Sequence, residues 1–229
     1  RLIVRMGVNV QKGQDVVIYA DLDQPEFVAM VVEEAYKAKA REVTVEWNYP
    51  ALTKYHVRYQ SLKTLSTVED WQIEKRKHQV ETLPCRIHLI SDDPDGLKGI
   101  NMAKMAKARQ NRYPILKPFS DQMENRQQWC IAAVPGLAWA KKVFPGVRGS
   151  QAVEKLWEAI LSTSRVNGDA VQAWKDHDKD LMDRCAYLNN LGIASLHYTA
   201  ANGTDLRVGM IKEARFCGGG ETNRQGIFF

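Results

Sequence analysis

The sequence predicts an α/β protein in which a mostly parallel sheet has helices on both faces, followed by the start of a second domain that contains antiparallel strands. Two observations support this prediction. Short apolar runs rich in β-branched residues recur at intervals of about 27, 44 and 43 residues, which suits β-α-β crossovers. Beyond residue 190, short segments alternate with Gly and Asn turns, a pattern typical of local antiparallel strands.

The first β-α unit is the clearest in the sequence. Residues 15–20 form an apolar run after a turn at Gly13, and we expect a strand that is buried on both faces. Pro25 suits the first turn of a helix, and apolar side chains over 27–36 recur at helical spacing. A second strand rich in Val is expected over 42–47.

The middle of the chain continues this alternation of helices and strands. The expected elements are, in order, helices over 51–62 and 66–82, a strand over 86–91, a helix over 101–113 and a strand over 128–134.

Local signals suggest where two of these helices begin or end. Ser66 or Thr67 is the candidate cap of the second helix, because Glu69 follows Ser66 at the spacing of a capping box. Pro114 and Pro118 should end the third helix, since proline lacks the N–H that an interior helical turn uses.

After the loop 144–146 the pattern changes to two amphipathic helices and then to short strands. The first helix places a broad apolar stripe on one side, and the second covers about 169–190. The expected strands are 193–198, 205–210 and 213–216. We therefore place a boundary near 185–192, which gives an amino-terminal α/β domain over 1–188 and the truncated beginning of a second domain over 189–229.

Composition excludes several classes of protein. Of the 229 residues 45% are hydrophobic and 26% are charged, so the chain is expected to fold rather than stay disordered. No apolar run approaches the roughly 18–20 residues of a membrane-spanning helix. The net charge of +5 is spread along the chain, and the densest basic run, 74–78, has acidic neighbours. We expect neither a membrane nor a nucleic acid partner.

Cysteine usage and the amino-terminal residues indicate a cytoplasmic protein. The four cysteines form no Cys-x-x-Cys pair and no cluster at zinc spacing, and they are Cys85, Cys130, Cys185 and Cys217. Reduced thiols are the simplest interpretation. The apolar stretch at 2–8 is too short for a signal peptide.

Three features could carry chemistry, and each has a simpler explanation. The glycine run 218–220 could hold a phosphate, but Asn223 stands where a Gly-x-Gly-x-x-Gly motif needs Gly, so a turn is the better interpretation. The acidic stretch 176–180 could contribute metal ligands, but it also matches the polar side of a helix. The remaining histidines are isolated, and they are His56, His78, His88 (interpreted as a core residue) and His197.

The carboxyl ends of the strands are the default ligand region of an open α/β sheet. In this sequence the four strand ends contain several acids, and they are 19–23, 47–49, 91–93 and 134–136.

Five further segments occur in a fixed order. They are MGVNVQKGQ at 6–14, WCIAAVP at 129–135, WAKKVFPG at 139–146, LWEAI at 156–160 and GTDL at 203–206. In this order and with these intervals, the chain resembles the amino-terminal half of the thermophilic metal-dependent aminopeptidases, the family that includes aminopeptidases T and S.

The resemblance implies a cytoplasmic, homodimeric exopeptidase of greater length that removes amino-terminal residues from peptides with two divalent metal ions (zinc, cobalt, manganese or magnesium). It also implies that the metal ligands lie in a carboxy-terminal domain, beginning at an Asn-x-Pro-Ser/Thr-Glu-Glu segment that follows the residues matching 225–229. The α/β domain would border the catalytic cleft and limit access to it. We therefore assign no catalytic, cofactor-binding or metal-binding residue to this chain, and we expect it to be inactive alone.

Two other readings stay open. The chain could be a free-standing α/β binding or interaction module without peptidase activity, if its gene ends at Phe229. A doubly wound nucleotide-binding domain is the third reading, although no glycine fingerprint supports it.

Overall fold

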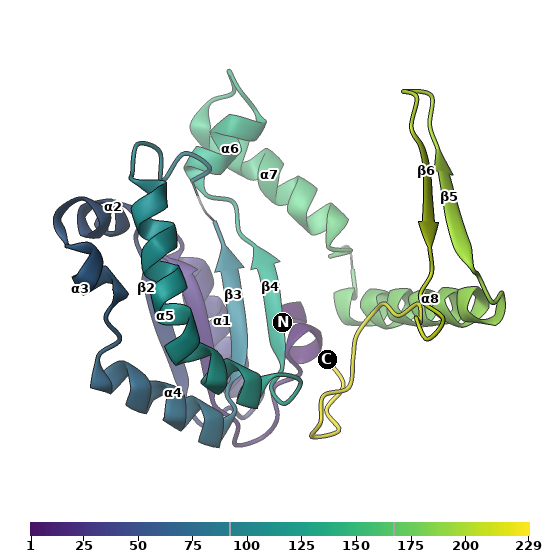
Figure 1. Cartoon of the computed structure of the whole chain (residues 1–229), viewed down its shortest axis with the longest axis horizontal. Helices are drawn as coiled ribbons and strands as arrows, with labels where there is room; N and C mark the ends of the chain where they lie inside the picture. Colours follow the sequence, from purple (N-terminus) through teal and green to yellow (C-terminus); the bar gives the residue numbers. More distant parts are fainter. Residues whose placement is uncertain (92, 167) are drawn as a thin grey trace. The chain divides into compact units, whose positions relative to one another are not determined.

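The computed structural model describes residues 1–91, 93–166 and 168–229, and the chain forms two compact units (Figure 1). The first unit comprises the described residues before 168 together with Thr222–Phe229, and the second is Gly168–Glu221. The first unit contains a four-stranded sheet, and the second contains a long helix and a two-stranded sheet.

The first unit is built on a parallel sheet, as the sequence predicts. Its strands are β1 (Val16–Asp21), β2 (Val43–Asn48), β3 (Cys85–Ile90) and β4 (Trp129–Ala133), in the spatial order β2-β1-β3-β4. All three pairings are parallel, and every strand end lies within one residue of its predicted position. The apolar runs and their spacing were therefore sufficient to locate the sheet.

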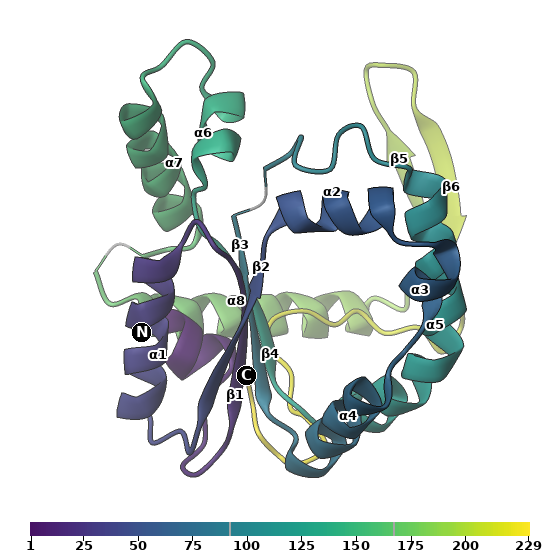
Figure 2. The ribbon, with the colours of Figure 1, turned by 90° about the vertical axis from the view of Figure 1, so that its left-hand side faces the viewer.

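Helices lie on both sides of this sheet, which confirms the predicted fold class (Figure 2). One side carries the π-helix η1 (Ile3–Gly7) and α1 (Pro25–Lys37). The other side carries α2 (Pro50–Tyr59), α3 (Leu62–Ser66), α4 (Asp70–Thr82) and α5 (Met102–Met123).

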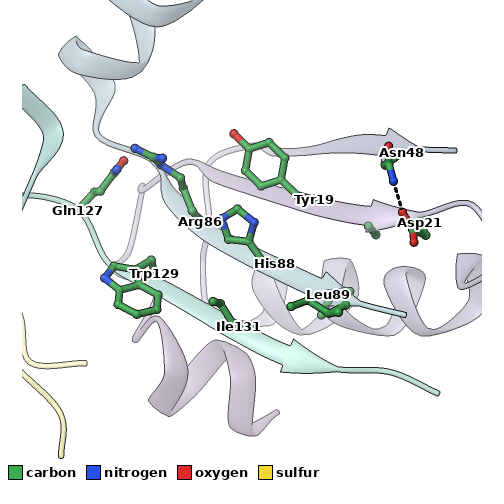
Figure 3. Close-up of a pocket in the computed structure, with 11 residues that line it drawn as sticks. Tyr19, Asp21, Asn48, Arg86, His88, Leu89, Gln127, Trp129 and Ile131 are labelled. Carbon is green, nitrogen blue, oxygen red and sulfur yellow. Dashed lines mark hydrogen bonds between the residues drawn. The ribbon is translucent and has the colours of Figure 1, made fainter. Parts of the chain in front are cut away.

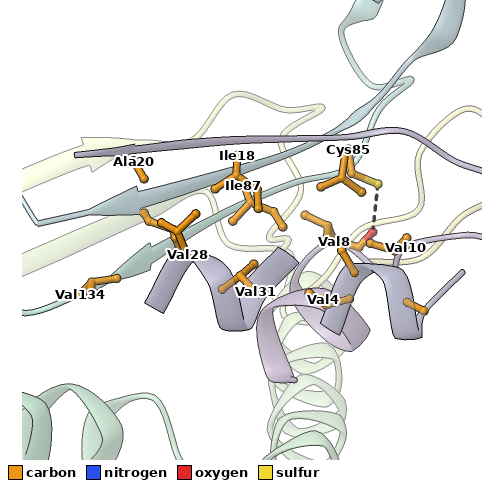
Figure 4. Packing of buried hydrophobic residues seen from close by; sticks show 14 residues of the cluster. Val4, Val8, Val10, Ile18, Ala20, Val28, Val31, Cys85, Ile87 and Val134 are labelled. Atoms are coloured by element: carbon orange, nitrogen blue, oxygen red, sulfur yellow. Dashed lines mark hydrogen bonds between the residues drawn. The ribbon is translucent and has the colours of Figure 1, made fainter. Parts of the chain in front are cut away.

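The main core lies between the sheet and the side that carries η1 and α1 (Figure 4). Ile18 of β1 and Ile87 of β3 are register partners at its centre, and both are 0% exposed. The helical side contributes Val4, Val8, Val28 and Val31. Gly7 allows η1 to approach β4, because a Cβ on this residue would lie 2.5 Å from Cys130 Sγ.

Helix α5 continues through Pro114 and Pro118, so the predicted end at residue 113 is wrong. Each proline removes one backbone donor from the helix, although its φ angle suits a helix. Tertiary contacts hold the two ends. Lys104 donates to two carbonyl groups at the end of α2, at 2.7 and 2.6 Å, and Met123 is fully buried. We infer that these contacts outweigh the lost helical hydrogen bonds.

The cap of α4 also differs from the prediction. Glu69 is the cap, and it forms a capping box with Gln72. Ser66 and Thr67 instead donate their hydroxyl groups to carbonyl oxygens one turn earlier, at 2.7 and 3.0 Å. Their hydroxyl groups therefore close α3, and they are not used to begin α4.

A smaller apolar cluster joins α6 (Leu137–Val143) to α7 (Gly149–Thr163). The predicted apolar stripe over residues 153–161 lies on α7, whereas α6 had no separate prediction. Trp157 of this stripe packs against Phe27 of α1, with ring centroids 5.3 Å apart, and so connects α7 to the main core.

The second unit consists of α8 (Ala170–Asn190) and an antiparallel pair, β5 (Ser195–Thr199) and β6 (Asp205–Gly209). Every residue of these three elements is at least partly exposed. The third strand predicted over 213–216 does not form. The Asn189 side chain instead bonds both backbone groups of Phe216, at 2.8 and 2.9 Å. The boundary between domains at 188 and 189 stays a prediction.

The final segment, Thr222–Phe229, is bonded to the first unit. Arg224 N donates to Asn125 O at 2.7 Å, and Asn9 Nδ2 donates to Phe228 O at 2.7 Å. Across the described residues, none of the helices combines the length and the apolar character needed to cross a membrane.

The one-sided core predicts that two isoleucine substitutions will lower the free energy of unfolding by different amounts. Ile87→Ala should lower the free energy of unfolding by about 2–5 kcal/mol, because it leaves a cavity between the sheet and α1. Ile131→Ala on the neighbouring strand is the matched control, since Ile131 is 56% exposed and should cost about 1 kcal/mol or less. Urea unfolding curves of the two variants measure the difference. Equal losses would contradict the one-sided core.

The thiols should differ in reactivity. Cys85 is buried and donates to Gln14 Oε1 at 2.9 Å, and burial raises its pKa to about 12. Burial also raises the pKa of Cys130 to about 11, whereas Cys217 is exposed. Brief iodoacetamide treatment at about pH 8 should therefore modify Cys217 first and leave Cys85 and Cys130 unmodified. Mass spectrometry of native and denatured samples measures this order, and early modification of Cys85 would contradict it.

Candidate functional site

The predicted strand-end residues do come together at the carboxyl edge of the parallel sheet, apart from Asp92, which lies outside the described residues. Ser91 Oγ donates to Asp23 Oδ1 at 2.6 Å, and Asn48 Nδ2 donates to Asp21 Oδ1 at 2.5 Å. Asp21 and Ser91 are buried. These carboxylates therefore hold the strand ends and the loops that follow them.

Gly136, the residue that precedes α6, lies against the same edge. A Cβ there would lie 2.9 Å from Asp23 Oδ2 and still closer to the carbonyl oxygen of Ser91. The loops after three strands are thus packed against one another, which leaves the edge closed by its own polar groups.

The acids at this edge do not fit a two-metal centre. Among the described residues there is no group of three or more His, Cys, Asp or Glu side chains that could hold a metal ion. Asp23 and Asp21 are each bonded to a neutral side chain from a neighbouring strand end.

A hollow of about 520 Å³ lies on the sheet face that looks away from η1 and α1, on the side that carries α2–α5 (Figure 3). We call this face the open face, because its side chains line the hollow and do not join the main core. Tyr19, Arg86 and His88 alternate along the strands with core residues, so their side chains point away from η1 and α1. The core residues Ala20 and Leu89 also border the hollow. The lining residues come from all four strands and from Gln127, which precedes β4, and they include Tyr19, Asn48, Arg86, His88 and Trp129.

Tyr19 and His88 form the middle of the hollow. They are register partners on β1 and β3, and their rings stack with centroids 4.7 Å apart and planes 12° apart. The sequence interpretation of His88 as a core histidine is therefore wrong, because its side chain is half-buried on the open face. Burial lowers the pKa of His88, and the nearby Arg86 charge lowers it further.

Arg86 occupies the amino-terminal end of the hollow. Its guanidinium donates to Met123 Sδ at 3.6 Å, and it enters no ion pair within the described ranges. Burial lowers the pKa of this group below its ordinary value, with Tyr19 opposing the effect and Arg76 adding to it. A partly buried cation without a carboxylate is energetically costly unless something binds it.

Apolar and polar groups complete the hollow. Trp129 and Ile131 of β4 are 52% and 56% exposed on its wall. Gln127 is buried, and its Oε1 atom has no hydrogen-bond partner in the described part of the chain. The sequence contained a signal for this face: in 85–90, Arg and His occupy alternate positions between buried apolar residues.

The other sequence candidates are accounted for within the second unit. Asp178 Oδ1 accepts from Gly220 N at 2.6 Å, and Gly219 has φ +87°, so the glycine run forms a turn held by the acidic stretch. His197 was predicted to be isolated, but its Nε2 lies 2.7 Å from Asp205 Oδ1 across the hairpin. The segment 203–206 forms the turn between β5 and β6 and the start of β6.

The remaining three histidines contribute nothing to the hollow, and His177 of α8 packs edge-on against the Trp174 ring. Gln60 Nε2 lies 3.3 Å from His56 Nδ1 at the end of α2, and His78 is exposed on α4.

The fold is an α/β domain with helices on both sides of the sheet, in which one sheet face is packed in the main core and the other carries the hollow. The family model described as thermophilic metalloprotease (M29) matches residues 1–229, and the chain belongs to this family. This result confirms the resemblance carried by the five ordered segments.

Individual relatives agree with the family match. Aminopeptidase AmpS of Bacillus subtilis is 33% identical over 231 residues, which cover 100% of this chain and 56% of AmpS. Aminopeptidase T of Thermus thermophilus is 30% identical over 227 residues, which cover 98% of this chain and 55% of the relative.

A solved structure supports the same assignment. Wild-type AmpT from Thermus thermophilus matches the fold with a TM-score of 0.88 and 28% identity, covering 99% of this chain and 56% of that chain. The chain thus spans about half the length of the relatives it matches.

The environment of His88 predicts a pH dependence of stability. Its pKa is lowered from 6.5 in the folded state, so the unfolded state binds the proton first as the pH falls. The free energy of unfolding should therefore decrease as the pH falls below about 6.5, towards the folded-state pKa. His88→Phe keeps a ring beside Tyr19 and should flatten this part of the profile.

Denaturant unfolding at a series of pH values measures the effect. His78→Gln is the control, because His78 is exposed on α4, and it should keep the wild-type profile. Identical profiles for His88→Phe and the wild type would contradict the assigned environment.

Proposed function

We propose that this chain is part of a metal-dependent aminopeptidase that removes amino-terminal residues from peptides. The observation that carries the proposal is the family match over residues 1–229, supported by relatives named aminopeptidases. By the same likeness, the complete enzyme is proposed to be a cytoplasmic homodimer that uses two divalent metal ions (zinc, cobalt, manganese or magnesium).

The metal centre is proposed to lie in the part of the relatives that this chain does not span. The strand-edge carboxylates of the first unit are engaged with Ser91 and Asn48, so they supply no adequate ligand set. No catalytic, cofactor-binding or metal-binding residue is assigned to the chain. Its proposed contribution is to border the cleft and restrict the peptides that reach it.

The exposed apolar side chains of the second unit support the proposal that further protein covers this unit in the complete enzyme. Its helix and hairpin have no fully buried residue, and large apolar side chains are exposed on them. Across the second unit, the most exposed large apolar side chains are Ile211, Tyr187 and Leu191. Apolar side chains at this density are typical of a surface that another part of a protein covers.

One observation favours the second reading, a free-standing binding module. The hollow on the open sheet face carries an arginine without an ion-pair partner in the described residues, which is a property of a ligand site rather than of a scaffold. The two readings differ in what the reading frame encodes after Phe229.

Activity assays separate these readings. The purified 229-residue chain should give no turnover of amino-acid p-nitroanilides with added zinc, cobalt, manganese or magnesium, because its described residues contain no group of three or more potential metal ligands. A protein extended to the full reading frame should give metal-dependent turnover that a chelator removes. Turnover by the short chain would contradict the inactivity proposal, and no turnover by the extended protein would contradict the enzyme proposal.

A further inference from the structure

The hollow on the open sheet face has a cationic end. Arg86 lines it, and Arg76 of α4 lies close enough to lower the pKa of Arg86. Arg76 Nη1 donates to Gln79 Oε1 at 2.9 Å, and the ion pairs found across the described ranges include neither arginine. Two neighbouring cations without a carboxylate create a positive potential that favours an anion.

The amide of Gln127 provides a second, independent sign of a ligand. Gln127 is 8% exposed and lines the hollow, and within the described residues its Oε1 has no hydrogen-bond partner. Figure 3 shows this amide at the same end of the hollow as the Arg86 guanidinium. A buried polar atom without a partner requires an explanation, and a bound group or its water can supply the missing bond.

The remaining walls are aromatic and apolar. The stacked rings of Tyr19 and His88 lie next to Arg86 (Figure 3). On the neighbouring strand β4, Trp129 and Ile131 lie beside Arg86 and His88 as their register partners. The only acid that lines the hollow, within the part of the chain described, is Asp21 at the far end, where it accepts from Asn48. The potential therefore orients a ligand with its negative group at Arg86.

We propose that this hollow binds a small organic carboxylate with an apolar or aromatic body, whose carboxylate pairs with Arg86. The planar guanidinium can donate two parallel hydrogen bonds to a carboxylate, and the rings offer contact area to the body. The volume of about 520 Å³ falls within the range of small-molecule sites, about 300–1,000 Å³. This proposal does not depend on the peptidase reaction.

Calorimetric titration of the purified protein with 3-phenylpropionate tests the proposal. We expect saturable binding, and 3-phenylpropionamide, which has the same shape without the charge, should bind more weakly by about tenfold or more. Sulfate should bind more weakly than the carboxylate, because it leaves the apolar walls in contact with water.

Substitutions locate the binding to this hollow. Arg86→Gln should weaken 3-phenylpropionate binding by about tenfold or more, and Arg86→Lys should retain part of it. Arg109→Gln is the matched control, because Arg109 is an exposed arginine on α5 outside the hollow, and it should leave binding unchanged. Circular dichroism and thermal unfolding establish that each variant is folded.

A second variant keeps the test valid if Arg86→Gln fails to fold. Trp129→Leu changes an exposed side chain, and it should weaken binding of the phenyl compound while leaving acetate binding unchanged. The proposal is overturned if 3-phenylpropionate does not bind, if the amide binds equally well, or if the folded Arg86 and Trp129 variants bind like the wild type.

Two probes distinguish the sources of the carboxylate. Tighter binding of L-phenylalanine than of N-acetyl-L-phenylalanine supports the proposal with a free amino acid as ligand. The reverse order supports it with the carboxyl terminus of a peptide as ligand. Failure of both to bind, with 3-phenylpropionate also unbound, overturns it, whatever the peptidase assays show.

Discussion

The burial of Ile18 and Ile87 on one face of the two central strands is the constraint on which the rest of the first unit depends. Both side chains are 0% exposed, and they are register partners between β1 and β3. Because successive side chains of a strand point to opposite faces, burying this pair places Tyr19 and His88 on the other face. A one-residue shift in register would bring polar rings into the core, so the apolar face fixes the pairing.

The two faces of the sheet consequently have different physical roles. The closed face is apolar and packed against η1 and α1, and it supplies the stability of the unit. The open face carries Arg86 and His88, whose pKa values are lowered mainly by burial. The apolar packing of the closed face thus offsets the free-energy cost of partly burying Arg86 and His88 on the open face, and perturbed pKa values of this kind are typical of binding sites.

Polar contacts contribute more to the stability of the second unit than to that of the first, because α8 and the hairpin contain no fully buried residue. Asp178 holds the glycine turn, Asn189 holds the backbone of Phe216, and His197 pairs with Asp205. The contacts of Asp178 and Asn189 join residues 42 and 27 positions apart, so no local sequence pattern predicts them. The contact between His197 and Asp205 depends on the register of the hairpin. The chain belongs to the M29 family and spans about half the length of the relatives it matches.

The sequence by itself determined the four parallel strands, most of the helices, the late change to an antiparallel pair and the family, because these depend on local periodicity and on motif order. Tertiary structure alone decided that α5 runs through Pro114 and Pro118, since contacts at Lys104 and Met123 compensate for lost local bonds. It also decided that Asp21 and Asp23 are bonded to neutral side chains of neighbouring strand ends, and that Arg86 and His88 line one hollow. Such features depend on which sheet face packs into the main core, and that choice follows from contacts between residues distant in the sequence.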